Sequence, residues 1–182
     1  MAIREFYIAD FHAGHKKIID YEQRPFRDCA EMEETIIKNW NSVVRMDDIV
    51  MVLGDVSFYP KEITKKIIEG LNGRKFLITG NHDGHSLAWW QSVGFVFVSK
   101  WPILRHKWLI CSHEPIYLEK NTPYRNIHGH IHGNRTLSDK HFNVSVENIN
   151  YTPILLSEIL KVIAPNDEAV AEPGQEEAGD DE

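Results

Sequence analysis

The chain has 182 residues, which is enough for one domain with a substantial hydrophobic core, and 42% of them are hydrophobic, as in ordinary globular proteins. Its net charge of −7 comes from the acidic stretch 165–182, because removing the eight acidic residues of that stretch leaves +1. A body so close to neutral lacks the basic excess typical of nucleic-acid-binding proteins, and no apolar run reaches the roughly 18 residues that a membrane-spanning helix needs.

These features predict one domain over residues 1–164, followed by an acidic tail over 165–182. We expect the tail to be disordered, because it is highly charged and poor in large apolar side chains. The first residues mix charged and apolar side chains, and they are predicted to form a strand rather than a signal peptide. The two cysteines, Cys29 and Cys111, provide no disulfide framework, so we expect a cytoplasmic location.

The first half of the chain alternates predicted strands and helices. Residues 3–9 are predicted to form a strand, and residues 28–44 a helix with one apolar face. A second, buried strand is expected over 47–55, a second helix from Pro60, and a third strand over 74–80. Because strand–helix–strand units favour parallel pairing, this half predicts a parallel sheet with crossover helices.

The second half contains shorter apolar runs separated by turns. Four runs are predicted to form a second, more antiparallel sheet: 96–100, 102–113, 125–133 and 141–146. Two sheets with helices outside them would form an α/β sandwich.

Aspartate, asparagine and histidine side chains are concentrated where these predicted strands end. Ligand sites in open α/β sheets form at strand ends, so residues far apart in the sequence can meet there. Nine residues make up the candidate site: Asp10, His12, Asp55, Asn81, His82, Asp83, His113, His130 and His132. Carboxylate, amide and imidazole groups suit first-row divalent metals. The set is too large for one tetrahedral ion, but it suffices for two ions that share a carboxylate.

The order of these groups resembles the calcineurin-like metallophosphoesterase superfamily. Five blocks occur in that order: DFH from Asp10, GD at Gly54–Asp55, GNHD from Gly80, SHEP around His113 and GHIH ending at His132. The resemblance implies a two-sheet β-sandwich with flanking helices, in a four-layer α/β/β/α arrangement. It also implies hydrolysis of a phosphomonoester or phosphodiester by metal-activated water.

The resemblance further implies a role for each residue. The ligands of the first metal ion would be Asp10, His12, Asp55 and His132. The ligands of the second would be Asp55, Asn81, His113 and His130. Asp55 would therefore bridge the two ions, for which Mn²⁺ is favoured and Fe, Zn, Ni and Co are alternatives. His82 would protonate the leaving oxygen, and Asp83 would orient or charge-stabilise His82.

Several alternatives stay open. Asp83 could instead be a hydrogen-bonding residue of its own loop. The fold could serve as a catalytically silent scaffold, as it does in the retromer subunit of the superfamily, or the protein could be a nuclease. Nucleases of the superfamily carry extra domains, so we expect a small phosphate-ester substrate, and neither nucleic acid nor a membrane as partner. A homodimer through exposed aromatic residues is a further hypothesis.

Other residues near these blocks have weaker predictions. His106 and His141 are expected at the surface. Trp89 and Trp90 either belong to the core or form a stacking face for a base or an aryl ester. Gly80 is expected to let the backbone turn sharply after its strand.

Overall fold

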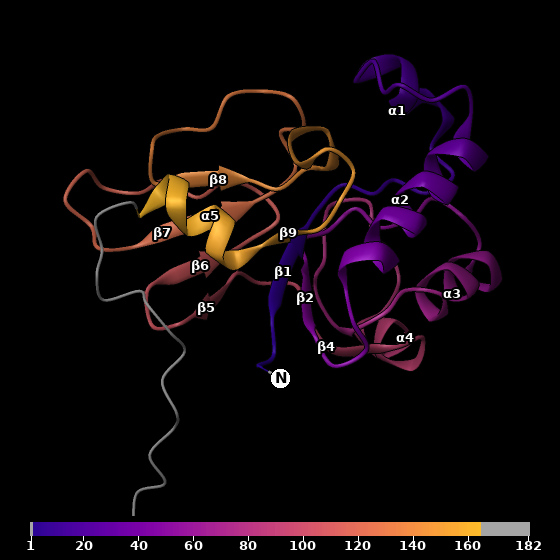
Figure 1. Ribbon diagram of the computed structural model, residues 1–182, viewed down its shortest axis with the longest axis horizontal. Helices are drawn as coiled ribbons and strands as arrows, with labels where there is room; N and C mark the ends of the chain where they lie inside the picture. Colours follow the sequence, from indigo (N-terminus) through magenta and orange to yellow (C-terminus); the bar gives the residue numbers. More distant parts are fainter. Residues whose placement is uncertain (1, 165–182) are drawn as a thin grey trace, which may run out of the picture.

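The computed structural model describes residues 2–164, and the predicted acidic tail, 165–182, lies outside the described residues. Two β-sheets stand side by side with helices around them (Figure 1). Buried side chains from both sheets belong to one hydrophobic core, which includes Phe6 of the first sheet and Ile127 of the second. The predicted α/β class with two sheets and flanking helices is confirmed.

The first sheet has the strand order β4–β3–β2–β1–β9. Its strands are β1 (Glu5–Ile8), β2 (Ile49–Val52), β3 (Arg74–Ile78), β4 (Phe95–Ser99) and β9 (Ile154–Leu155). Strands β1 to β4 run parallel, and β9 pairs antiparallel with β1. The parallel sheet predicted for the first half of the chain is therefore confirmed.

One strand was assigned to the wrong sheet. The run 96–100, expected in the second sheet, belongs to β4 and pairs parallel with β3. The reason is α4 (Leu87–Ser92), a short helix in a stretch without a predicted helix. Ser86 caps this helix by accepting a hydrogen bond from the Trp89 N–H at 3.2 Å. The helix supplies the crossover that returns the chain to the same sheet.

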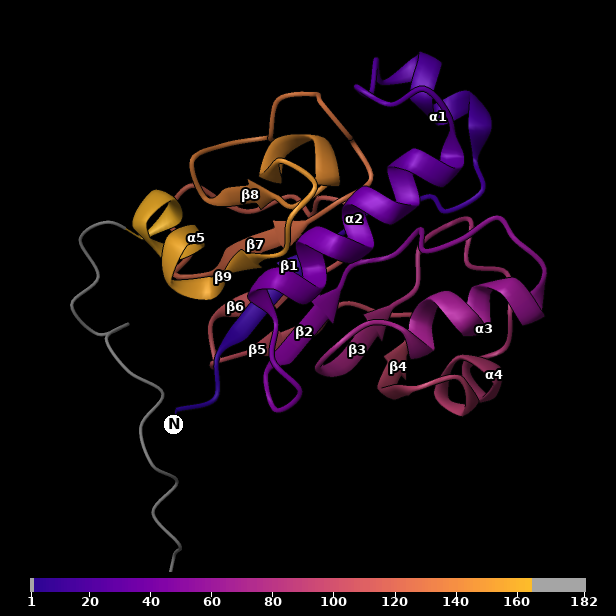
Figure 2. The ribbon, with the colours of Figure 1, turned by 45° about the vertical axis from the view of Figure 1, so that its right-hand side comes forward.

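Two longer helices pack against the first sheet on the face away from the second sheet (Figure 2). They are α2 (Cys29–Val43) and α3 (Lys61–Glu69). The Asp28 side chain begins α2 by accepting a hydrogen bond from the Glu31 N–H at 2.9 Å. The fully buried residues of α2 are Met32, Ile36 and Trp40, which recur every four residues as expected for one face of a helix.

The second sheet has the order β5–β6–β7–β8. Its strands are β5 (Ile103–Arg105), β6 (Leu109–Cys111), β7 (Arg125–His128) and β8 (His141–Asn143). The prediction of a more antiparallel sheet is wrong, because β5 and β6 are antiparallel whereas β6–β7 and β7–β8 are parallel. The long connections 112–124 and 129–140 allow this, since each can return the chain to the starting end of the sheet.

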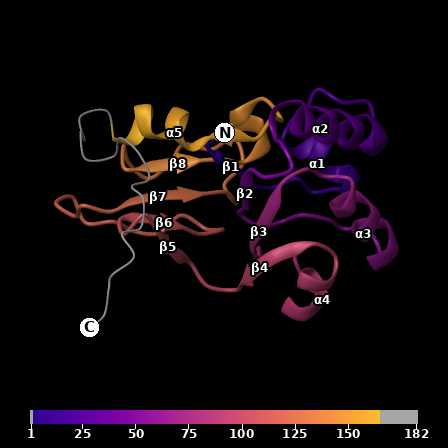
Figure 3. The same ribbon diagram turned by 60° about the horizontal axis from the view of Figure 1, so that its bottom comes forward.

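The remaining helices are α1 (Lys16–Tyr21), the 3-10 helix η1 (Val146–Ile149) and α5 (Leu156–Ile163). Helix α5 contacts β8, β9 and β1, and it lies beside the β8 edge of the second sheet (Figure 3). In the predicted α/β/β/α arrangement, a layer of helices would cover the second sheet. The described chain has only the short helix α5 there, and it contacts strands of both sheets. Within residues 2–164, no helix has the length and apolar character to cross a membrane.

Candidate metal centre

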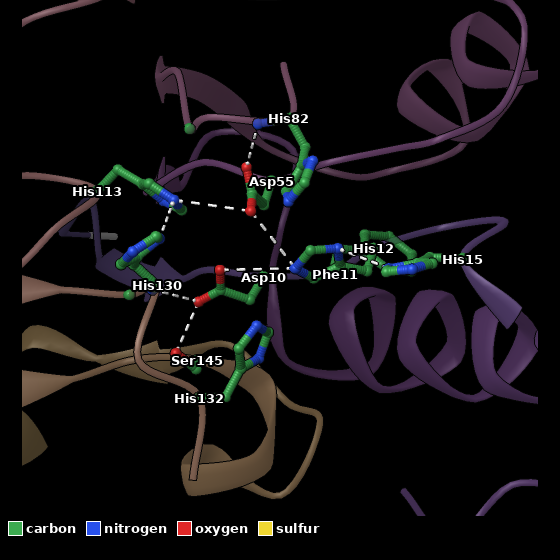
Figure 4. Close-up of polar contacts among 12 residues, drawn as sticks. Asp10, Phe11, His12, His15, Asp55, His82, His113, His130, His132 and Ser145 are labelled. Atoms are coloured by element: carbon green, nitrogen blue, oxygen red, sulfur yellow. Dashed lines mark hydrogen bonds and ion pairs between the residues drawn. The ribbon is translucent and has the colours of Figure 1, made fainter. Parts of the chain in front are cut away.

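The nine candidate residues lie in loops that follow five parallel strands. Asp10 and His12 follow β1, Asp55 follows β2, Asn81 to Asp83 follow β3, His113 follows β6, and His130 and His132 follow β7. The loops lie side by side because the Asp10 N–H donates to the Gly54 carbonyl at 3.0 Å and the His12 N–H donates to the Asp55 carbonyl at 2.9 Å. As Figure 4 shows, the side chains of Asp10, His12, Asp55, His113, His130 and His132 gather in one place.

Asp55 lies at the middle of this cluster. Its Oδ1 atom accepts a hydrogen bond from the His82 N–H at 2.9 Å. Its Oδ2 atom lies 3.5 Å from His12 Nε2 on one side and 3.6 Å from His113 Nε2 on the other (Figure 4). One carboxylate oxygen therefore faces two separate histidine groups, which is the position a shared ligand needs.

The first group is formed by Asp10, His12 and His132, whose candidate ligand atoms lie within 4.8 Å of one another. Asp10 Oδ2 accepts hydrogen bonds from Ser145 Oγ at 2.6 Å and from the His130 N–H at 2.8 Å. Asp10 Oδ1 and His12 Nε2, 3.8 Å apart, are buried and have no hydrogen-bond partner. Buried polar atoms without partners are rare in proteins, so this pair fits an ion bound between them.

The second group is formed by Asn81, His113 and His130. Asn81 Oδ1 lies 2.9 Å from His113 Nε2 and 3.1 Å from His130 Nδ1, and the two ring nitrogens are 3.1 Å apart. His113 Nδ1 lies 2.7 Å from the Leu53 carbonyl and donates its proton there, which leaves the lone pair of Nε2 directed toward Asn81 and Asp55.

The electrostatics of the first group favour a cation. Burial raises the pKa of Asp10 to about 6, although His113, His132 and the hydrogen bond from Ser145 oppose the rise. Burial, together with the charges of His132 and Arg24, lowers the pKa of His12 to about 2. The His12 imidazole is therefore neutral with a free lone pair, and a divalent ion would stabilise both this lone pair and the Asp10 carboxylate.

The backbone of the candidate ligands is strained. Five of them have positive φ angles: Asp10 at 58°, His12 at 55°, Asp55 at 55°, His130 at 69° and His132 at 47°. Each such conformation in a non-glycine residue costs about 1–3 kcal/mol and persists where the surroundings enforce it, most often at functional sites. The conformation turns each side chain away from its strand and toward the shared centre.

Two motif glycines are required by close packing. A Cβ atom on Gly80 would lie 2.1 Å from Asp55 Oδ1, and one on Gly129 would lie 2.4 Å from the Ala9 Cβ and 2.5 Å from Asp10 Oδ2. Gly80 begins the turn after β3, since its carbonyl accepts a hydrogen bond from the Asp83 N–H at 3.3 Å, although Gly80 is not among the glycines with positive φ. It is needed because the loop after β3 touches the central carboxylate.

The Asp83 side chain makes hydrogen bonds of the kind expected for a residue that fixes its own loop. Its carboxylate accepts hydrogen bonds from the N–H groups of Asp55 at 2.8 Å, Val56 at 2.9 Å and Gly80 at 2.8 Å. The side-chain hydrogen bonds that Asp83 makes in the described chain go to these backbone groups, and its role in orienting or charge-stabilising His82 stays a prediction.

His82 is exposed and lies beside the cluster. Its ring centroid is 5.7 Å from that of His12 and 4.8 Å from that of Phe58. The hydrogen bond from its N–H to Asp55 ties its backbone directly to the central carboxylate. The side chain is therefore open to solvent at the mouth of the centre.

Three supporting residues were not identified from the sequence: Arg24, Ser145 and Glu147. The buried Arg24 guanidinium donates to the carbonyls of Asp10 at 2.8 Å and Phe11 at 3.1 Å, and to Glu147 Oε1 at 2.6 and 2.9 Å. Glu147 Oε1 also lies 3.2 Å from His132 Nδ1. This network fixes the strained backbone after β1 and the orientation of the His132 ring.

Three weaker predictions are settled by burial. His141 is buried, not at the surface, because its Nε2 lies 2.7 Å from the Ile116 carbonyl and its Nδ1 lies 2.9 Å from Ser138 Oγ. His106 is exposed as predicted and pairs with Glu5. Trp90 is completely buried and belongs to the core, and Trp89 is partly buried and packs against it.

No family model matches the chain. It is 36% identical over 176 residues to the uncharacterized protein MJ1445 of Methanocaldococcus jannaschii, across 90% of this chain and 93% of that protein. Its fold is similar to that of AQ665 from Aquifex aeolicus, a protein of unknown function, with a TM-score of 0.70, 26% identity and coverage of 89% and 100% of the two chains. A weaker likeness, with a TM-score of 0.48 and 20% identity, is to Pseudomonas putida nuclease MPE over 71% of this chain and 62% of that one. The identity to MJ1445 extends over nearly the full length of both chains, so the chain belongs to the same protein family as MJ1445.

Proposed function

We propose that the protein is a phosphoesterase of the calcineurin-like metallophosphoesterase type, which hydrolyses a phosphomonoester or phosphodiester with two divalent metal ions. The observation that carries the proposal is the position of Asp55 Oδ2, 3.5 Å from His12 Nε2 and 3.6 Å from His113 Nε2. A carboxylate between two groups of nitrogen and oxygen donors suits a pair of cations that share one ligand.

The donors present fit two ions. The first ion would be held by Asp10, His12, Asp55 and His132. The second would be held by Asp55, Asn81, His113 and His130. We propose Mn²⁺, with Fe, Zn, Ni or Co as alternatives that the same nitrogen and oxygen donors accept. When bound, such ions supply Lewis-acid stabilisation of phosphate oxygens and acidify water.

The residues of the chain would position the metal ligands and donate one proton. Hydrogen bonds to Ser145 and to the His130 N–H hold one oxygen of Asp10, so that its other oxygen is left free. His82 would donate a proton from its imidazole to the leaving oxygen, a role that suits its exposure and its tether to Asp55. Asp83 would act only by fixing the loop that carries His82.

The substrate would be a small phosphate ester. The described body is close to neutral once the acidic stretch 165–182 is set aside, which does not favour strong binding of nucleic acid. The described cysteines, Cys29 and Cys111, are free thiols, and we therefore propose a reducing, cytoplasmic location.

Metal analysis and activity measurements on the same samples test the proposal. Wild-type protein loaded with Mn²⁺ should contain about two ions per chain and hydrolyse bis(4-nitrophenyl) phosphate or 4-nitrophenyl phosphate. Asp55→Ala should lose metal and activity together, because both groups share its carboxylate. His82→Ala should retain metal but lose about 10²-fold or more in kcat, as expected for removal of a proton donor.

His106→Ala is the matched control, because it removes a histidine that pairs with Glu5 outside the centre. It should leave metal content and kcat unchanged. Metal-replete wild-type protein that hydrolyses neither ester would contradict the proposal and favour a silent scaffold. Cleavage of DNA in preference to both esters would favour a nuclease.

A further inference from the structure

A cavity of about 600 Å³ adjoins the candidate metal centre. It lies between the loop after β3, the turn after β4 and the loop after β6. Asn81 and His113 line it and also belong to the second donor group, so the cavity and the centre share a wall. Its volume is within the range of small-molecule binding sites. A substituent on a phosphate held at the centre could therefore extend into it.

The rim of the cavity carries an unusually exposed tryptophan. Trp101 is 77% exposed, although burying an aromatic ring of this size is normally favourable. Its backbone is nevertheless fixed, because Ser99 Oγ accepts a hydrogen bond from the Trp101 N–H at 2.9 Å and donates one to the Trp101 carbonyl at 2.8 Å. Another part of the lining is also fixed, since the Ile116 N–H donates to Asn126 Oδ1 at 3.0 Å. The Trp101 side chain is thus exposed to solvent while the backbone that carries it is fixed by hydrogen bonds.

The lining of the cavity suits a flat, uncharged group. Apolar surface comes from Trp101, Pro102, Pro115 and Ile116. Lys100 and Glu114 contribute opposite charges to the lining, and the third carboxylate or ammonium residue there, Asp83, is buried with its carboxylate hydrogen-bonded to backbone N–H groups. The exposed rim therefore offers no excess of either sign to a second phosphate or an ammonium group. Tryptophan stacks well on planar rings, and flat aromatic ligands lose little conformational entropy on binding.

We propose that this cavity, the Trp101 pocket, binds a planar aromatic substituent of the phosphate ester, either a nucleobase or an aryl group. The proposal rests on the proposed function, because it assumes that the phosphate sits at the metal centre. It assigns to Trp101 the stacking role that was one alternative for Trp89 and Trp90 in the sequence; Trp90 is buried in the core, and Trp89 is partly buried against it.

Calorimetric titration of phosphomonoesters into Mn²⁺-loaded protein tests the pocket. All titrations use the His82→Ala background, so that hydrolysis does not consume the ligand. Phenyl phosphate is compared with butyl phosphate, and thymidine 5′-monophosphate with ribose 5-phosphate. At least one aromatic ligand should bind roughly 10-fold more tightly than its non-aromatic counterpart, as expected for one stacked ring. The pair that shows the preference identifies an aryl group or a nucleobase as the occupant.

Substitutions at Trp101 separate stacking from other effects. Trp101→Ala should abolish the aromatic preference while leaving the affinity for inorganic phosphate unchanged, and Trp101→Phe should retain most of the preference. Leu104→Ala, which removes an exposed side chain on β5 outside the pocket, should change neither quantity.

Equal affinity for aromatic and non-aromatic ligands would overturn the inference, as would a preference that survives Trp101→Ala. Failure of inorganic phosphate itself to bind would overturn the proposed function, and the inference with it. These two failures are distinguishable, because inorganic phosphate does not depend on the pocket.

Discussion

The Asp83 carboxylate accepts a hydrogen bond from the Asp55 N–H at 2.8 Å and thereby joins the loop after β3 to the loop after β2. The same side chain accepts hydrogen bonds from the N–H groups of Val56 and Gly80. Burial raises the pKa of Asp83, while the three backbone donors oppose the rise. Asp83 thus holds the strained backbone that presents the central carboxylate of Asp55.

Asp83→Ala should lower the free energy of unfolding by about 3 kcal/mol, because three N–H groups, two buried and one part-buried, lose their acceptor at roughly 1 kcal/mol each. The affinity of the Asp83→Ala protein for Mn²⁺ should fall as well. Denaturant titration and calorimetry measure the two effects. If stability and metal affinity stayed at wild-type values while the pH profile of hydrolysis shifted, Asp83 would instead act on His82 as the sequence first suggested.

Gly129→Ala should disrupt the metal centre, because the added Cβ would lie 2.5 Å from Asp10 Oδ2 and 2.4 Å from the Ala9 Cβ. We expect at least a 10-fold loss in Mn²⁺ affinity together with lower stability. Gly84→Ala is the control, since a Cβ there meets no atom within 4 Å. Equal behaviour of the two variants in a metal titration would show that the close approach at Gly129 does not matter.

Arg24→Met should destabilise the protein by about 3–5 kcal/mol, because it leaves the buried Glu147 carboxylate without its main cation. It should also weaken Mn²⁺ binding, since the carbonyls of Asp10 and Phe11 lose their donors. Arg27→Met should have little effect, because that arginine is fully exposed.

The Arg24–Glu147 pair can be isolated with the double variant Arg24→Met/Glu147→Gln. Its loss in unfolding free energy should be smaller than the sum of the two single losses, since each single change already breaks the same pair. Strict additivity in a denaturant titration would mean that the two residues act independently.

Glu5 should make stability depend on pH at acid values. Burial raises its pKa, but hydrogen bonds from His106, Arg105 and Tyr7 outweigh burial and bring the pKa down to about 2. Because the folded-state pKa is below the ordinary value, the stabilisation is complete above about pH 4.5 and is lost as the pH falls toward 2. Glu5→Gln should remove about 2–3 kcal/mol at pH 6 and much less at pH 2.5. A difference between the two proteins that is independent of pH would contradict this assignment.

The sequence predicted elements best where local pattern decides structure. The apolar periodicity of α2 and the buried runs of β1 to β3 were sufficient, because a helix face and a buried strand each impose their own spacing on the chain. The prediction failed for β4, whose sheet partner depends on the six-residue helix α4. It also failed for the direction of β7 and β8, which run parallel to β6 because the connections 112–124 and 129–140 carry the chain back to the starting end of the sheet.

By itself, the sequence determined which chemical groups the candidate site has and that they follow predicted strands, because residue type and apolar spacing are local properties of the chain. Only the tertiary structure decided how they are arranged. Asp55 faces two donor groups, the Asp83 carboxylate accepts hydrogen bonds from backbone N–H groups, and the Arg24 guanidinium donates to the Asp10 carbonyl. These outcomes depend on side-chain direction and long-range packing. Left-handed φ angles at non-glycine residues, which turn the donors inward, are enforced by neighbours far away in the chain and leave no local mark in the sequence.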